Sequence, residues 1–305
     1  MNQTNQVFII TLSIITLGFL IKKFNYISEQ EGKIISKFLM HSTFPALMFL
    51  STARIKFDSK ILQIPFYPIL LGLSMLAVGW FWFRKYPNQL RGVLTMGLGG
   101  FNTGLFGFPI IEGLFGKEAM IYAIMFDIGN TFIVFGVIYS IGNYFSASKS
   151  EQNTFFSILK KIITLPPVLA LLLGICVSIL AIPLPPTFVD FLDILAKANK
   201  PLVLLLMGIY LSFELNKRTM QAISQVLMIR YAIGLVVVFG IYRFFPVATL
   251  TRNVLMLCTL LPIGLTILPF SDQQGYDSRI AGTMLNISLL ISFGLMWGLV
   301  LFLGI

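Results

Sequence analysis

Apolar residues run through most of this chain in long blocks, which short polar segments separate. Ten blocks are long enough to cross the roughly 30 Å apolar layer of a bilayer as α-helices. The pattern therefore predicts an all-α integral membrane protein. The expected transmembrane helices cover residues 6–22, 33–53, 64–83, 90–113, 119–145, 161–182, 188–213, 221–245, 251–271 and 279–304.

The one sizeable hydrophilic stretch lies near the middle of the chain, over 146–160, and divides the expected helices five and five. We therefore expect a first five-helix repeat over 1–145, a cytoplasmic linker over 146–160 and a second five-helix repeat over 161–305. An odd number of helices in each half makes the second repeat enter the membrane upside down relative to the first.

Sequence landmarks indicate that the two halves are related. Gly18 and Pro45 have counterparts 156 residues later, and Gly104 and Pro109 have counterparts 160 residues later. The fold class predicted is thus ten transmembrane helices in two inverted repeats. The counterparts are Gly174, Pro201, Gly264 and Pro269.

The fourth and ninth expected helices carry glycines and prolines near their middles, in GLGGFNTGLFGFPIIEGLFG and CTLLPIGLTILPFSD. Proline removes a helical hydrogen bond, and glycine makes the helix easier to open. Opened backbone at membrane depth persists only against protein or a water-filled cavity. Two such breaks at matching positions favour a transport site, where freed amides attract anions and freed carbonyls hold cations. The alternative is helix packing through glycines, with proline kinks.

Composition and charge support the membrane assignment. Hydrophobic residues make up 57% of the 305 residues and charged residues only 11%, whereas a soluble domain has about a quarter of its residues charged. The net charge of +10 comes from Lys and Arg at the ends of apolar blocks, so we assign it to lipid headgroups and exclude nucleic acid. The odd-numbered loops hold 13 of these cations and the even-numbered loops 8. This predicts a multi-pass protein of the cell membrane with both termini outside.

Ionisable and polar residues inside the expected helices are candidates for function, because they are costly there. Asp127, with Asn130 one turn away, is a candidate proton carrier or cation ligand, or else a structural acid paired with a base. Asn286 matches Asp127 at an offset of 159 and is included as an ion-coupling candidate. Lys200 and Arg230 lie in mid-helix and either attract an anion or neutralise Asp127, or else reach out to the surface.

Other residue types argue against metal sites, cofactors and disulfides. His41 is the only histidine, so a metal site is not expected, and a proton-linked role stands beside that of a polar interface residue. Cys176 and Cys258 lie in apolar runs and are expected to be small core residues. No GxxxxGK[ST] loop is present in the sequence, so transport driven by ATP on this chain is not expected.

Several segments, in this order and spacing, resemble the auxin efflux carrier family, which includes plant PIN proteins and bacterial organic-acid permeases. They are LGFLIKKFNYISEQEGK, FPALMFL, the fourth-helix segment from Asn102 to Gly116, PPVLALLLG and LLPIGLTILPFSDQQGYD. The resemblance implies that helices four and nine are unwound and cross near the membrane centre, and that an organic anion such as malate moves by an elevator-like motion. It also places Asn102, Pro109 and Pro262 at the crossing. The short central loop differs from that of long PIN proteins, so regulation by loop phosphorylation is not implied.

The sequence thus predicts a secondary transporter of a small carboxylate, coupled to protons or sodium, in a lipid bilayer. Its assembly into a homodimer is a further possibility. A channel or a receptor of the same fold is the alternative, and an intramembrane hydrolase is disfavoured because only Asp127 lies deep in a helix. The substrate-binding candidates are Asn102, Thr103, Gly104, Pro109, Pro262, Gly264, Thr266, Thr43, Pro45 and Lys200.

Overall fold

The computed structural model describes residues 3–53, 61–146, 163–164, 166–211 and 217–304. Within these residues the chain is all helical, and its one β-type pairing is an isolated bridge. The prediction of an all-α protein is therefore confirmed. The predicted linker lies outside the described residues except for Ser146.

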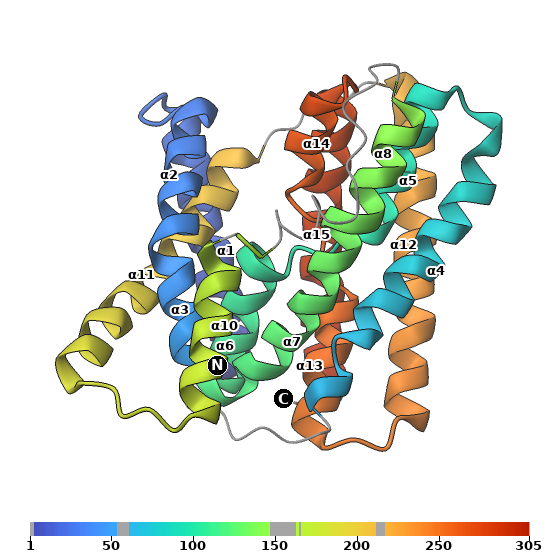
Figure 1. Ribbon diagram of the computed structural model, residues 1–305. Coiled ribbons are helices and arrows are strands. Elements are labelled where there is room, and N and C mark those ends of the chain that lie inside the picture. The colour runs from blue at the N-terminus through green and yellow to red at the C-terminus, as the bar shows by residue number, and fades with distance from the viewer. Residues whose placement is uncertain (1–2, 54–60, 147–162, 165, 212–216, 305) are drawn as a thin grey trace. The chain divides into compact units, whose positions relative to one another are not determined.

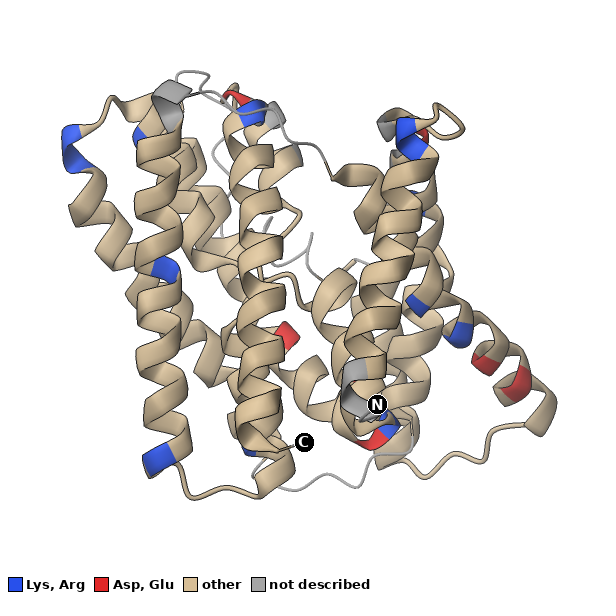
Figure 2. Cartoon of the chain, turned by 180° about the vertical axis from the view of Figure 1, so that it is seen from behind, with Lys and Arg blue, Asp and Glu red and all other residues tan. Residues whose placement is uncertain are grey.

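Among the residues that the structure describes, six helical segments are long and apolar enough to cross a membrane, and each overlaps one of the ten predicted helices. Charged residues are sparse along the ribbon (Figure 2). The prediction of a multi-pass membrane protein is supported at this level. The six segments are Gln6–Lys23, Gln30–Thr52, Ile61–Lys85, Lys117–Phe145, Met220–Phe244 and Arg279–Leu303.

The other four predicted helices are shorter, interrupted or more polar. The fourth consists of α5 (Asn88–Gly99) and α6 (Phe108–Phe115), joined by a π-helical turn, and the ninth of α13 (Thr249–Thr259) and α14 (Ile267–Gln273). The sixth is α10, Pro166–Ile179. The seventh, α11, runs over Pro186–Tyr210 but carries four charged residues.

The second predicted helix also differs, because the structure divides it into α2 (Glu29–His41) and α3 (Thr43–Thr52). Ser42 between them has φ −132° and ψ −74°, which is outside the helical range. Its hydroxyl donates to the carbonyl of Phe38, 2.7 Å away. A serine that bonds back to the preceding turn competes with the helix ladder, which is consistent with a break at this position.

The helices group into two compact units, and each unit draws on both halves of the chain. Unit 1 comprises Met1–Ile61, Gly104–Ile124 and Lys160–Leu211; unit 2 comprises Leu62–Thr103, Met125–Leu159 and Ser212–Ile305. Unit 1 therefore holds α1 (Gln3–Lys23), α2, α3, α6, α10 and α11. Unit 2 holds α4 (Phe66–Trp82), α5, α8 (Tyr139–Phe145), α12 (Lys217–Phe244), α13, α14 and α15 (Ser278–Leu303), and α7 (Met120–Thr131) runs from one unit into the other.

Unit 1 is built on close helix contacts at glycines. A Cβ added to Gly208 on α11 would lie 2.0 Å from the carbonyl oxygen of Ile15 on α1, and one added to Gly18 would lie 2.1 Å from that of Leu205. Helices approach this closely only where a side chain is missing. The pairing of α1 with α11 therefore depends on glycine at both positions.

A second pair of helices in unit 1 repeats these contacts. On α10, a Cβ added to Gly174 would lie 2.7 Å from the carbonyl oxygen of Phe49 on α3. The Thr52 hydroxyl, also on α3, donates to the carbonyl of Leu171 on α10, 3.3 Å away. The pair α3 and α10 thus meets at positions that lie 156 residues from those of the pair α11 and α1.

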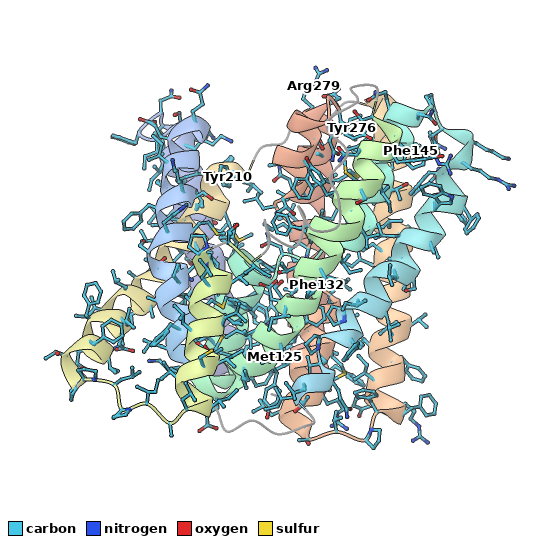
Figure 3. The ribbon with its side chains drawn as sticks, viewed as in Figure 1. Met125, Phe132, Phe145, Tyr210, Tyr276 and Arg279 are labelled. Carbon is cyan, nitrogen blue, oxygen red and sulfur yellow. The ribbon has the colours of Figure 1, made fainter. Side chains whose placement is uncertain are left out.

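Unit 2 places α5 among α4, α8, α12 and α15 (Figure 1). The loop after α14 is tied to α8, since the Tyr276 hydroxyl donates to the carbonyl of Gly142 over 2.5 Å and the Ser146 hydroxyl to that of Gln274 over 2.6 Å. Tyr276 and Phe145 both lie against Gly92 of α5, and Figure 3 shows them close together at one end of this unit. These contacts tie the start of α5 to the end of α14.

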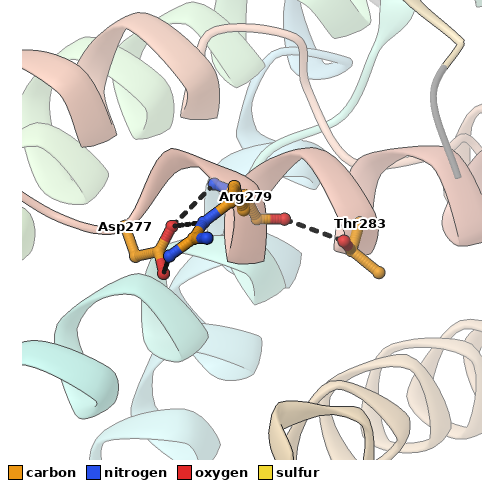
Figure 4. A network of polar contacts seen from close by, with 3 residues as sticks. All are labelled: Asp277, Arg279 and Thr283. Carbon is orange, nitrogen blue, oxygen red and sulfur yellow. Dashed lines mark hydrogen bonds and ion pairs between the residues drawn. The ribbon is translucent and has the colours of Figure 1, made fainter. Parts of the chain in front are cut away.

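The last helix has a side-chain cap at its start. The Asp277 carboxylate accepts a hydrogen bond from the backbone N–H of Arg279, at 3.1 Å, and two from its guanidinium, at 3.0 Å each (Figure 4). The Arg279 side chain holds the pKa of Asp277 below its ordinary value. At the other end, Gly304 adopts φ 69°, a left-handed conformation that ends helices.

Candidate functional site

Two helices of unit 2, α5 and α13, stop well inside the apolar segments that contain them. α5 ends at Gly99, and Gly100 continues in an extended conformation with φ −96° and ψ 149°. α13 ends at Thr259, three residues before Pro262, which has no N–H to continue the helical ladder. Both breaks fall in the glycine- and proline-containing segments that the sequence identifies.

The two broken segments meet through their backbones. Phe101 and Ile263 form an antiparallel bridge, and the Asn102 N–H donates to the carbonyl of Pro262 over 2.9 Å. Pairing with the other segment thus replaces part of the hydrogen bonding that each helix loses at its break. Pairing of this kind lets unwound backbone persist inside an apolar protein.

Asn130 on α7 pairs with the backbone of Phe101 in the first break. Its carboxamide oxygen accepts from the Phe101 N–H at 3.0 Å, and its amide nitrogen donates to the Phe101 carbonyl at 2.9 Å. The same nitrogen lies 3.1 Å from the Thr103 hydroxyl oxygen and 3.2 Å from the Asp127 carboxylate. Asn130 is 4% exposed, so its carboxamide acts as a buried substitute for a neighbouring strand.

Two serines of α15 satisfy the second break. The Ser288 hydroxyl oxygen accepts from the Ile263 N–H at 3.0 Å, and the Ser292 hydroxyl donates to the Leu260 carbonyl at 2.6 Å. The Tyr231 hydroxyl on α12 contacts both, donating to the Ser288 carbonyl at 2.7 Å and lying 2.8 Å from the Ser292 hydroxyl oxygen. The sequence analysis missed these three residues. Polar side chains one turn apart in an apolar helix are the signal that would have found the two serines.

Arg230 on α12 lies between the ends of the two interrupted helices. Its guanidinium donates to the Leu98 carbonyl at 2.7 Å and the Gly97 carbonyl at 3.4 Å, in the last turn of α5. It also donates to the carbonyls of Leu261 and Pro262, at 3.0 and 3.3 Å, just beyond α13. The side chain is 1% exposed. Arg230 therefore bonds neither Asp127 nor any other carboxylate of the described chain, contrary to one of the roles considered for it.

Asp127 forms a polar cluster with residues of the first break. Its carboxylate accepts hydrogen bonds from the Thr103 hydroxyl and from Asn130. No Lys or Arg is paired with it in the part of the chain that the structure describes. The role of a structural acid paired with a base is therefore not supported among these residues, whereas a role in proton or cation binding stays a prediction.

Asn102 lies where the two broken segments meet. The Asn102 side chain is 6% exposed, and in the described residues its carboxamide has no hydrogen-bond partner. Pro262, whose carbonyl accepts from the Asn102 N–H, is buried, and so is Gly264. Half-buried Thr266 is the last residue before α14. Pro269 is the third residue of that helix and lies in its first turn.

The candidates in unit 1 occupy a different set of contacts. The Thr43 hydroxyl donates to the side-chain oxygen of Asn199 over 2.8 Å, in buried surroundings at the start of α3, where half-buried Pro45 follows. Half-buried Lys200, on α11, has its ammonium beside Gly113 of α6. It makes no hydrogen bond or ion pair with the residues described.

The two remaining candidates on the unit 1 part of the broken fourth helix are backbone positions. Gly104 lies against the Phe44 ring, where an added Cβ would approach to 3.0 Å. Pro109 is buried in the first turn of α6, where a proline costs no hydrogen bond. The proline thus starts the second half of the helix and does not merely interrupt the first.

Other singled-out residues take no part in this geometry. His41 is exposed and contacts the Lys37 carbonyl of its own helix through Nδ1, at 2.8 Å. Asn286 is buried on α15. Cys258 is buried as expected, whereas Cys176 is exposed, so its assignment to the core was wrong. No cluster of three metal-ligating side chains occurs among the described residues.

Comparison with known proteins decides the family. A family model described as a membrane transport protein matches residues 4–297. This chain belongs to that family. The resemblance to auxin efflux carriers is thereby confirmed, and the family consists of membrane transporters and not of enzymes.

Two archaeal relatives are similar along almost their whole length. An uncharacterized transporter of Methanocaldococcus jannaschii is 24% identical over 307 residues, covering 97% of this chain and 98% of the relative. An uncharacterized transporter of Methanothermobacter thermautotrophicus is 22% identical over 287 residues, covering 92% of each. Family membership thus indicates a transporter in a lipid bilayer.

Proposed function

We propose that the protein is a secondary active transporter of a small organic anion, such as malate or another carboxylate. In this proposal the anion binds where helices four and nine cross, and alternating access carries it across the cell membrane. The observation that carries the proposal is the meeting of two interrupted helices at Phe101 and Ile263, beside the unpartnered Asn102 carboxamide. Paired broken helices are the usual framework of binding sites in secondary transporters.

The proposed fold has ten transmembrane helices in two inverted five-helix repeats, 1–145 and 161–305. Its support is an exchange of contacts in unit 1. The contact of Gly18 with Leu205 becomes that of Gly174 with Phe49 when 156 residues are added to one partner and subtracted from the other. A twofold relation between repeats requires such an exchange.

Two further contacts follow the same rule. The approach of Gly208 to Ile15 corresponds to the hydrogen bond between Thr52 and Leu171. A residue on the axis should contact its own counterpart, and the Thr43 hydroxyl bonds Asn199, which lies 156 residues later. The landmarks and the contacts therefore support one offset for this part of the chain.

For the substrate, we propose that Asn102 hydrogen-bonds a carboxylate. The Asn102 side chain is 6% exposed, and its carboxamide offers both a donor and an acceptor to a ligand. Backbone amides near Gly104 and Gly264 and the hydroxyl of Thr266 would add donors, and bonds to an ionised carboxylate are stronger than neutral ones. Thr103 would contribute a donor only on releasing its hydrogen bond to Asp127. Pro262 would keep the second break from closing into a helix, and Pro109 would fix the start of α6 beside the first.

Lys200, Thr43 and Pro45 are further proposed substrate-binding residues, and all three belong to unit 1. A half-buried ammonium with no carboxylate beside it, such as that of Lys200, exerts a stronger field than one in water. Thr43 and Pro45 would shape the same region, with Pro45 fixing the start of α3.

For coupling, we propose that Asp127 takes up a proton together with the anion, with Asn130 and Asn286 as its supporting residues. A proton on Asp127 would make the loaded site less charged, which lowers the cost of moving it through apolar surroundings. Sodium is the other coupling ion to test. We also propose that both termini face outward, on the basis of the 13 cations in the odd-numbered loops against 8 in the others.

Uptake of radiolabelled organic acids into proteoliposomes tests the proposal. Asn102→Ala should weaken substrate binding while the protein still inserts and purifies as the wild type does. Asn88→Ala is the matched control, because Asn88 is exposed at the start of the same interrupted helix. Equal affinity in the wild type and Asn102→Ala would show that Asn102 does not bind the substrate.

A second set of measurements separates coupling and mechanism. Asp127→Asn should lose acceleration by an inward proton gradient and retain exchange of labelled for unlabelled substrate. Full proton-driven accumulation by that variant would rule out Asp127 as the coupling residue. Saturable uptake with counterflow distinguishes a carrier from a channel, and flux that does not saturate and shows no counterflow would contradict the proposed transporter.

A further inference from the structure

The charge of Arg230 is balanced in an unusual way. Its Nη1 and Nη2 donate four hydrogen bonds to backbone carbonyls at the ends of both interrupted helices, and its buried Nε has no partner among the described residues. None of the described carboxylates is paired with it. The guanidinium also lies over the Phe101 ring, with its central carbon 4.6 Å from the ring centroid. A fully buried cation needs negative partners, and here the backbone and an aromatic face supply them.

Helix ends account for the balance. The last turn of an α-helix carries about half a negative charge on its unsatisfied carbonyls. α5 and α13 both end next to Arg230, so the two ends together present about one negative charge to one guanidinium. A planar group with several donors can reach two helix ends at once, which a lysine ammonium on the same stem does less well.

The same carbonyls are where a coupling cation would be expected. In transporters with broken helices, unwound carbonyls and half-helix C-terminal ends coordinate Na⁺. At this crossing the carbonyls of Gly97, Leu98, Leu261 and Pro262 are already taken by Arg230.

We propose that Arg230 is the resident cation of the crossing: it holds the two helix ends together and makes substrate binding there independent of sodium. This rests on the proposed transport function. Arg230 acts through the backbone of Phe101, Asn102 and Pro262, so it is a positioning residue and does not itself touch the substrate. The position 156 residues earlier is Ser74, so the first half of the chain carries no cation at the matching position. Among the described side chains, Arg230 alone bonds the carbonyls at both breaks.

The first test measures uptake with sodium and with choline as the external cation. Wild-type uptake should be the same in both. Uptake by Arg230→Ala should be at least tenfold lower than that of the wild type, and uptake by Arg230→Lys should lie between the two. Uptake by Arg243→Ala should match the wild type, because Arg243 is exposed at the end of the same helix. A sodium requirement in the wild type, or an active Arg230→Ala, would overturn the proposal.

The second test does not depend on transport. Thermal unfolding in detergent should show a lowered midpoint for Arg230→Ala, and millimolar methylguanidinium should raise that midpoint but not those of the wild type or Arg243→Ala. An Arg230→Ala midpoint equal to that of the wild type, or lowered without response to methylguanidinium, would contradict the role as a cation. If Arg230→Ala cannot be purified, the wild-type midpoint decides: one that rises when sodium replaces choline contradicts the proposal, and an unchanged one supports it. A wild type that transports no acid while the unfolding results hold would refute the transport function alone.

Discussion

Removing the Asn130 side chain gives a sharp test of how the first break is stabilised. Asn130→Ala would leave the Phe101 N–H and carbonyl without their partners at 3.0 and 2.9 Å, and would take a donor from Thr103 and Asp127. Each buried backbone group left unpaired costs about 1–3 kcal/mol, and measured values in membrane proteins lie at the lower end. We expect a loss of about 2–4 kcal/mol.

That loss can be read from thermal unfolding. With an unfolding entropy of about 2.1 cal/mol/K per residue over 305 residues, it corresponds to a midpoint lowered by roughly 3–6 °C. Asn130→Asp keeps an acceptor for the Phe101 N–H, but it loses the amide donor and places a second carboxylate beside Asp127. We therefore expect it to be at least as unstable as Asn130→Ala. Asn88→Ala should be unchanged. An Asn130→Ala midpoint within about one degree of the wild type would refute the assignment of these bonds.

Three more predictions concern packing and caps. Gly208→Ala should destabilise the pairing of α1 with α11 by about 1–3 kcal/mol, whereas Gly240→Ala, where an added Cβ meets nothing within 4 Å, should be neutral or stabilising; equal melting of the two would contradict the close contact. Asp277→Ala should cost about 1 kcal/mol at neutral pH, and because the pKa of Asp277 is lowered, its difference from the wild type should shrink as the pH falls below about 4. Tyr276→Phe should speed hydrogen exchange at the end of α8, since the bond to Gly142 is lost; unchanged exchange there would show that the bond contributes nothing.

The sequence was sufficient to locate the two breaks approximately, because Gly100 and Pro262 lie at them. Pro109 and Pro269, which were also part of the pattern, lie in the first turns of α6 and α14.

The sequence was not sufficient to find what satisfies the two breaks. Asn130 and Phe101 are 29 residues apart, and Ser288 and Ile263 are 25 apart, so no local pattern connects them. For Arg230 the sequence left two roles open, a partner of an anion or of Asp127 and a side chain that reaches the surface. Its partners are instead carbonyls, which every residue carries, so the side chain alone does not indicate them.

The packing of α1 on α11 sets an order of events during synthesis. Lys22 on α1 donates to the carbonyl of Leu211, 189 residues away, and the contact of Gly18 with Leu205 is nearly as distant in sequence. The first helix therefore leaves the ribosome and enters the bilayer long before its partner exists, while most of unit 2 up to α8 is inserted between them. Until α11 is inserted, the face of α1 around Gly18 contacts lipid or a protein of the insertion machinery. A chain truncated before Pro186 should accordingly leave α1 open to proteolysis or to capture by membrane chaperones.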